Sequence, residues 1–110
     1  MSIQTRRFMR LIVFFDLPVT TPEKKRAYIE FRRFLLKDGF VMLQWSVYTR
    51  ITNNYDDTKK HMRRLERNAP PEGSVRCLEV TEKQFTSMAI LVGQMSQQEK
   101  YVNSNQMTLL

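Results

Sequence analysis

The distribution of apolar and polar residues along the chain predicts a mixture of strands and helices. The segment from Phe8 to Leu17 is a dense run of β-branched and aromatic residues that Pro18 closes. Such a short run, apolar at nearly every position, is typical of a central strand covered on both sides. We therefore expect a central strand that is buried on both faces and ended by the proline.

The next segment, from Thr20 to Gly39, has the pattern of a helix. Thr21 is placed to cap it, Pro22 fits the first helical position, and Glu23 complements the positive end of the helix dipole. A glycine ends the pattern in the usual C-terminal position. The apolar residues at helical spacing are Ala27, Tyr28, Phe31, Phe34 and Leu35.

Strand character returns in the twelve residues Phe40–Ile51. They fit one long strand, and they also fit two short strands joined tightly at Gln44–Ser46, because neither glycine nor proline marks a turn there. Asn53–Asn54 is a turn and capping signal. The segment Tyr55–Asn68 then predicts a second helix, strongly basic and with a thin apolar stripe.

The last third of the chain begins with Ala69–Gly73, whose two prolines and glycine end the second helix. Ser74–Val80 then has the character of a strand. Thr81–Gln84 resembles a capping box that opens one helical turn, and Met88–Val92 is predicted as a short strand. If Phe40–Ile51 is a hairpin, the order is βαββαβ plus one strand. This α+β order is the ferredoxin-like arrangement, with two helices on one face of a sheet. The extra strand would extend a sheet edge, either the chain's own or a second subunit's.

Composition narrows the class of protein. The chain has 110 residues, which suits one domain, and its 42% hydrophobic and 26% charged residues are ordinary for a globular protein. One cysteine excludes a disulfide framework and a Cys-x-x-Cys zinc cluster. We find no signal-peptide pattern and no apolar run long enough to span a bilayer, so we expect a cytoplasmic protein without a membrane partner.

Charge adds a stronger constraint. The formal net charge is +7, and residues 1–67 carry 15 Lys and Arg against 7 acids. Residues 68–110 carry 3 against 4. This asymmetry is compatible with a polyanionic partner on the first two-thirds of the chain, and equally with solvated helix faces that bind nothing. The basic candidates for phosphate contacts without base readout are Arg26, Arg32, Arg33 and Lys37 on the first helix and Lys59, Lys60, Arg63 and Arg64 on the second.

Few residues are candidates for chemistry. His61 is the only histidine and is expected to be exposed on a basic helix, and Cys77 is expected to be a buried structural thiol. Asp16 directly follows the first strand, where a carboxylate can hold Mg²⁺ or Mn²⁺, although it also fits a turn before Pro18. One carboxylate makes a poor metal site, so a nuclease would require a symmetric dimer that supplies a second Asp16.

Several segments together resemble the small CRISPR-associated family Cas-two (Cas2), in particular the form that accompanies type II systems. The matching stretches are Met9–Pro18, Phe34–Phe40, Gln44–Tyr48 and Val80–Phe85. The likeness covers roughly residues 8–92. Any single stretch is a weak signal, but the ordered set in a chain of this length is fairly specific.

The resemblance implies a ferredoxin-like core over residues 1–92, a hairpin within Phe40–Ile51, and a homodimer. It also implies that the last short strand pairs with the partner's sheet. Such dimers stand at the centre of the spacer-acquisition complex, between two dimers of the integrase Cas-one (Cas1). Residues 93–110 resemble the tail that docks on this integrase.

Two functions follow from the resemblance. In the first, the dimer is a scaffold that binds the backbone of double-stranded prespacer DNA and helps to set its length. In the second, it is an endonuclease for RNA or DNA with Mg²⁺, or Mn²⁺ in its place, and the family's catalytic, metal-binding aspartate falls on Asp16. A third hypothesis, a ferredoxin-like regulatory domain for a small ligand, lacks any small-molecule signature in the sequence.

Overall fold

The computed structural model describes residues 8–93, so the expected tail and its role lie outside the described residues. The elements follow the order β-α-β-β-α-β-α, and Phe40–Ile51 is a hairpin. Across residues 8–93, no helix is both long and apolar enough to cross a membrane. The elements are β1 (Met9–Asp16), α1 (Pro22–Lys37), β2 (Val41–Gln44), β3 (Val47–Thr52), α2 (Tyr55–Asn68), β4 (Ser74–Thr81) and α3 (Glu82–Thr86).

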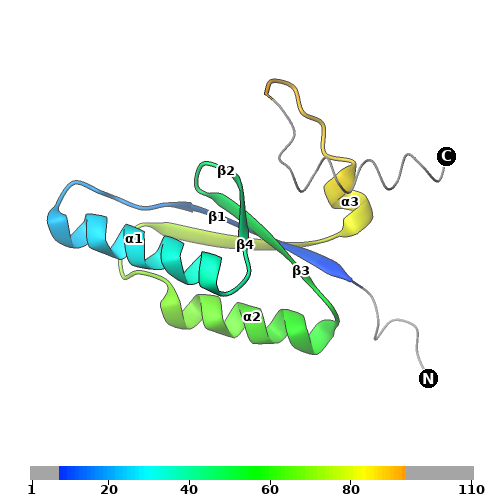
Figure 1. The fold of residues 1–110 in the computed structure, drawn as a ribbon, viewed down its shortest axis with the longest axis horizontal. Helices are drawn as coiled ribbons and strands as arrows, with labels where there is room; N and C mark the ends of the chain where they lie inside the picture. The colour runs from blue at the N-terminus through cyan, green and yellow to red at the C-terminus, as the bar shows by residue number, and fades with distance from the viewer. Residues whose placement is uncertain (1–7, 94–110) are drawn as a thin grey trace.

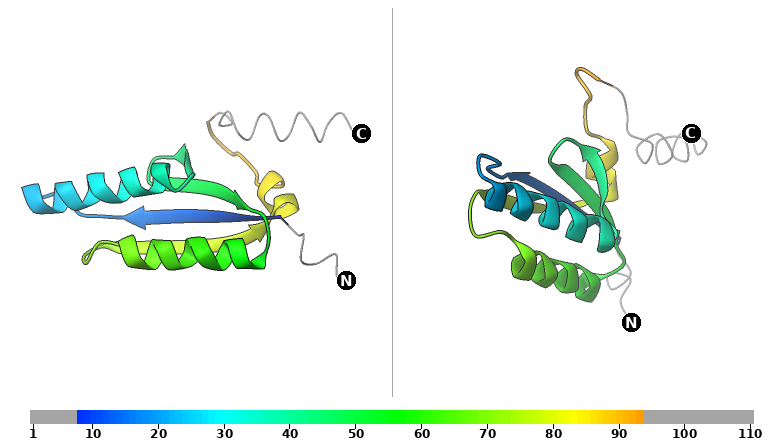
Figure 2. Two further views of the ribbon diagram at one scale, coloured as in Figure 1. Left: turned by 60° about the horizontal axis from the view of Figure 1, so that its bottom comes forward. Right: turned by 60° about the vertical axis from the view of Figure 1, so that its left-hand side comes forward.

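The strands form one antiparallel sheet in the order β2-β3-β1-β4. Helices α1 and α2 lie side by side against one face of this sheet (Figures 1 and 2). This is the ferredoxin-like α+β arrangement that the sequence pattern predicts. The predicted caps are also present, since the side chain of Thr21 accepts a hydrogen bond from the Lys24 N–H and Thr81 forms a capping box with Gln84.

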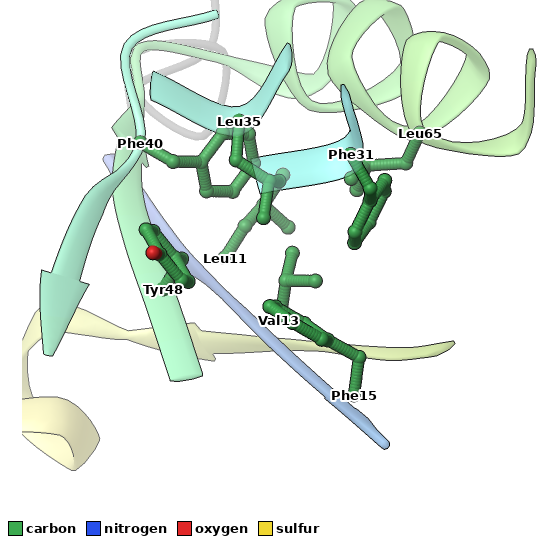
Figure 3. Packing of buried hydrophobic residues seen from close by; sticks show 8 residues of the cluster. All are labelled: Leu11, Val13, Phe15, Phe31, Leu35, Phe40, Tyr48 and Leu65. Carbon is green, nitrogen blue, oxygen red and sulfur yellow. The ribbon is translucent and has the colours of Figure 1, made fainter. Parts of the chain in front are cut away.

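The core lies between the sheet and the two helices. Leu11, Val13 and Phe15 alternate along β1 and point toward the helices, as Figure 3 shows. Phe31 and Phe15 pack edge to face, with 5.2 Å between ring centroids and an interplanar angle of 86°. The remaining buried members of this cluster are Leu35, Phe40, Tyr48 and Leu65.

The opposite side of β1 is not covered by a helical layer along most of its length. Ile12 is partly buried, and Phe14 is 39% exposed. The expectation of a strand buried on both faces is therefore wrong for this chain, because α1 and α2 lie on the same side of the sheet. Residues paired across the strands share this second face, which we call the open face; its exposed apolar members are Phe14, Val41, Ile51 and Leu78.

Helix α3 covers one end of the open face, at Arg10. The Arg10 guanidinium is fully buried and forms a bidentate ion pair with Glu82, with Nε–Oε1 and Nη2–Oε2 distances of 2.7 and 2.9 Å. It also lies 4.3 Å from the centre of the Phe85 ring. The two-pronged geometry and the aromatic contact offset part of the cost of removing this charge from water, although Nη1 is buried without a hydrogen-bond partner among residues 8–93, and they connect α3 to the sheet.

The predicted short strand Met88–Val92 is not a strand in this structure. Leu91 and Val92 are 91% and 94% exposed. A strand forms only where a neighbouring edge accepts its backbone hydrogen bonds, and the sheet of this single chain does not include the segment.

Asp38 joins α1, β3 and α2. Its N–H donates to the Phe34 carbonyl at 2.8 Å, and its carbonyl accepts a hydrogen bond from the Arg50 side chain. Its carboxylate accepts hydrogen bonds from His61 Nδ1 and Arg64 Nη1, both at 2.7 Å. His61 is therefore only 3% exposed, and the expectation of an exposed histidine is wrong, because α2 turns this side chain toward the end of α1.

Replacing Asp38 with alanine should destabilise the fold by about 3 kcal/mol, because it leaves the buried His61 ring and Arg64 without their shared acceptor. Urea unfolding followed by circular dichroism measures this change. Glu66→Ala is the matched control, since it removes an exposed carboxylate from α2 and should change stability by less than about 0.5 kcal/mol. Equal losses in the two variants would contradict the role given to Asp38.

Candidate nucleic-acid and metal site

Asp16 is the last residue of β1 and its side chain is exposed. Its backbone is held in place by the neighbouring strand, where Ser74 is its register partner. Gly73 precedes that strand with φ +93°, and a Cβ there would lie 2.7 Å from the Asp16 carbonyl oxygen. The alternation along β1 places Asp16 on the open face together with Phe14. The end of β1 thus presents a carboxylate from a fixed backbone position.

One chain does not supply a complete divalent-metal site around Asp16. Within residues 8–93, His, Cys, Asp and Glu side chains form no group of three or more that could hold a metal ion. Mg²⁺ needs several oxygen ligands in octahedral geometry, and phosphodiester cleavage usually uses more than one acidic ligand. The residues of a single chain therefore do not fit the implied metal, and a second Asp16 would have to come from another chain.

The eight predicted basic residues are all exposed on α1 and α2, but the structure brings only some of them together. Arg33 and Lys37 of α1 and Arg64 of α2 line one groove of about 510 Å³, with the Phe34 ring among them. Arg26 instead lines a neighbouring hollow on α1, which it shares with Arg33. The groove does not include Arg32, Lys59, Lys60 or Arg63.

The charges in this groove leave it basic. Its two carboxylates belong to Glu30 and Asp38, and the second of these already accepts hydrogen bonds from Arg64 and from His61. Arg33 and Lys37 are exposed on the same wall. Because Arg64 is already paired with Asp38, Arg33 and Lys37 are the cations of this groove that suit phosphate groups, which they would hold by charge without reading bases.

Outside the groove, Lys59 and Lys60 also have partners, which lie on their own helix, just as Arg64 has a partner in Asp38. Lys60 lies 3.2 Å from the Asp57 carboxylate, and the Lys59 ammonium lies 5.2 Å from the centre of the Tyr55 ring. Burial raises the pKa of Asp57, but hydrogen bonds from Asn53 and Lys60 and the nearby charges outweigh it, so this pKa lies below its usual value. Lys60 therefore already has an anionic partner within its own helix.

His61 and Cys77 are poor candidates for catalysis. His61 lies between two carboxylates, with Nδ1 2.7 Å from Asp38 and Nε2 3.3 Å from Asp57. Burial, with a smaller contribution from Glu79, raises the pKa of the Cys77 thiol to about 11. A thiol with so high a pKa is not a nucleophile at neutral pH, which agrees with the expected structural role of this partly buried cysteine.

The sequence analysis missed a stacked pair of aromatic rings near Asp16. Trp45 at the tip of the β2–β3 hairpin is 74% exposed, and its ring stacks on Tyr28 of α1 with 6.1 Å between centroids. Tyr28 is one of the apolar residues at helical spacing and is partly buried against the core. The only available signal was the single tryptophan at the site of the ambiguous turn.

The fold and the basic helical face define a small ferredoxin-like α+β protein with exposed cationic surfaces. A family described as "CRISPR associated protein Cas2" matches residues 9–88, so the chain belongs to this family. The chain is 59% identical over 101 residues to a protein of Acidovorax ebreus named "CRISPR-associated endoribonuclease Cas2", covering 92% of this chain and 99% of that protein. A protein of the same name from Treponema denticola is 45% identical over 98 residues, and the match covers 89% of this chain and 95% of that protein.

A solved structure titled "Crystal structure of cas2" agrees with the fold. It superposes with a TM-score of 0.58 at 21% identity and covers 82% of this chain and 92% of that one. At this identity the likeness concerns the fold alone. The family membership confirms the resemblance inferred from the sequence, and the paired strands β2 and β3 are the hairpin that this resemblance implies.

Cys77 in the folded protein should react with a thiol reagent at pH 8 at least about tenfold more slowly than in urea, because its raised pKa leaves little thiolate. Absorbance of the released reagent anion measures the rate, and Cys77→Ser provides the blank. Equal rates in the folded and unfolded protein would show that burial does not protect this thiol.

Proposed function

We propose that this chain is a dimeric scaffold of the CRISPR spacer-acquisition complex that binds the backbone of double-stranded prespacer DNA together with the integrase Cas1. The observation that carries the proposal is the basic groove between α1 and α2, lined by Arg33, Lys37 and Arg64. Its cations come from two helices and face solvent, so they can follow a phosphate backbone without regard to sequence. Membership of the Cas2 family supports the same assignment.

The open face supports the homodimer. Phe14, Ile51 and Leu78 expose apolar surface there, on strands that pair directly. Contiguous apolar surface on a small protein usually marks a contact with another protein. The exposed segment Met88–Val92 would pair with an edge of the partner's sheet, and residues 93–110 would contact the integrase.

Dimerisation also strengthens the electrostatic argument. Doubling the formal charge of +7 gives about +14 for the pair. Each chain contributes one groove on the outer side of its helices, so a pair joined through the open faces would carry two such grooves on its outer surface. This surface would attract a long polyanion more strongly than a single domain does.

The alternative is a metal-dependent endonuclease for RNA or DNA that uses Asp16 from each subunit. Two observations favour it: relatives of this chain are named endoribonucleases, and Asp16 lies on the open face beside Phe14. If the open faces of two chains meet about a two-fold axis that passes close to the end of β1, both Asp16 carboxylates would lie near that axis. This pair is the least that Mg²⁺ or Mn²⁺ would require, whereas the scaffold needs no chemistry from Asp16.

For the scaffold, we expect duplex binding that weakens as salt rises and does not depend on sequence. The double variant Arg33→Gln/Lys37→Gln should lower the magnitude of the slope of log K against log salt by about 2 for each groove that contacts the duplex, since each lost phosphate contact removes about 0.9. Fluorescence anisotropy with a labelled duplex, repeated at several salt concentrations, measures this slope.

The matched control is Lys59→Gln/Arg63→Gln, which removes the same charge from α2 outside the groove. A smaller change in slope for the control supports the groove as the contact. Equal changes in both variants would mean that binding depends on overall charge, and an affinity indifferent to salt would contradict the scaffold itself.

For the endonuclease, Asp16→Ala should abolish cleavage of RNA or DNA in Mg²⁺ or Mn²⁺ and leave duplex affinity within about twofold, because Asp16 is not in the groove. Gel assays of cleavage and cell-based assays of spacer acquisition are measured on the same variants. Asp56→Ala, another exposed aspartate, is the control. If the wild-type protein cleaves nothing across a range of pH, the endonuclease alternative is ruled out. If Asp16→Ala loses cleavage and retains spacer acquisition, the chain acts as a scaffold.

A further inference from the structure

The tip of the β2–β3 hairpin holds a tryptophan in an exposed but fixed position. Ser46 adopts the left-handed conformation with φ 61°, which allows the tight turn between the two strands. Its carbonyl accepts a hydrogen bond from the Phe15 N–H at 3.1 Å. The tip is therefore anchored to β1 one residue before Asp16, and Trp45 projects from it with 74% of its surface exposed.

The Trp45 ring is supported from one side only. It stacks on Tyr28 with an angle of 29° between the rings, and Tyr28 in turn meets the core ring of Phe15 at 6.2 Å. Three aromatic rings thus connect the surface to the core. Because Tyr28 covers one face of Trp45 and the residue is still mostly exposed, a flat surface is left for a further ring.

The surroundings of this pair suit an anionic chain that carries flat rings. On α1, Arg32 lies one helical turn from Tyr28 and is exposed. Lys24, one turn in the other direction, lies 3.4 Å from Glu72 and is therefore partly neutralised. Tyr28 and Lys24 also border a hollow of about 110 Å³ whose walls include Pro18, Pro70 and the carboxylates of Glu23 and Glu72, so the cation for a phosphate is Arg32 and not the hollow. Apolar walls, an exposed ring and a nearby cation are the elements of single-strand recognition.

We propose that Trp45 and Tyr28 form a stacking platform for an unpaired nucleobase, with Arg32 holding the adjoining phosphate. The proposal rests on the proposed nucleic-acid function and adds a preference to it: the platform favours a strand that leaves the duplex over a blunt duplex. The hydrogen bond from Phe15 to Ser46 places this platform at the same end of the sheet as Asp16. An unpaired base stacked on Trp45 would bring its strand toward that carboxylate.

A protein contact is the competing use of an exposed tryptophan. Protein hot spots lie near the centre of a dry patch and are surrounded by residues that exclude water. Trp45 instead stands at a hairpin tip next to Gln44 and within reach of a basic helix, and both Gln44 and Arg32 are exposed. These polar neighbours would keep the Trp45 ring in contact with water, which favours a nucleobase over a protein as its partner.

The single tryptophan makes a direct test available on the unmodified chain. A short single-stranded oligonucleotide should quench its fluorescence, because stacking of a base on the ring provides a decay path, and an abasic oligonucleotide of the same length should quench little. We also expect a duplex with unpaired ends to bind at least about fivefold more tightly than a blunt duplex. Equal quenching by the abasic strand overturns the proposal.

Variants give the second arm of the test. Trp45→Ala should lose the preference for unpaired ends and leave blunt-duplex affinity unchanged, whereas Trp45→Phe should keep most of the preference. Tyr55→Ala is the matched control, because it removes another exposed aromatic ring, on α2, and should keep the preference. A Trp45→Ala variant that keeps its preference, or changes only the dimer or its binding to Cas1, assigns the ring to a protein contact and overturns the platform.

The two proposals fail in different ways. If the platform is wrong but the scaffold is right, the blunt duplex still binds with a strong salt dependence and only the preference is missing. If the scaffold is wrong, the blunt duplex shows no salt-dependent binding, whatever the fluorescence of Trp45 does. Absence of binding by every oligonucleotide overturns both.

Discussion

Asp38 is the residue through which the end of α1, helix α2 and strand β3 are hydrogen-bonded together. Its carboxylate receives hydrogen bonds from His61 and Arg64 of α2, and its own backbone ends α1 and binds the Arg50 side chain of β3. Gly39 follows with φ +89°, and a Cβ there would lie 2.8 Å from the Arg50 guanidinium. This junction fixes the positions of α1 and α2, so it also fixes the groove that lies between them.

The fold gives the molecule two surfaces of different character, the outer side of the helices and the open face of the sheet. Since α1 and α2 cover the same face of the sheet, their outer sides carry most of the basic residues, and the open face keeps apolar side chains together with Asp16 and Arg76. The Arg10–Glu82 pair holds α3 over one end of that face. Any partner that covers the open face must therefore approach beyond α3, toward Phe14 and Asp16.

Local signals in the sequence predicted much of this fold, because helix caps, the spacing of apolar residues and turn sequences each depend on only a few neighbouring residues. Thr21 and Thr81 cap helices as expected, and the pattern around Leu65 identified α2. The burial of His61 and the exposed face of β1 depend on which elements meet, and a short window of sequence does not contain that information. For the same reason, eight basic residues were equal candidates until the packing of two helices selected three of them for the groove.

The position of Asp16 relative to the groove bears on how binding and cleavage would be related. The groove lies on the outer side of the helical layer, while Asp16 lies on the open face at the end of β1. The sheet and its core separate them, so one phosphate cannot reach both sites of the same chain. Binding in the groove and chemistry at Asp16 would thus involve different phosphates or different molecules. Trp45 stands at the end of the sheet where the two surfaces meet, since its ring stacks on α1 and its hairpin is hydrogen-bonded to β1.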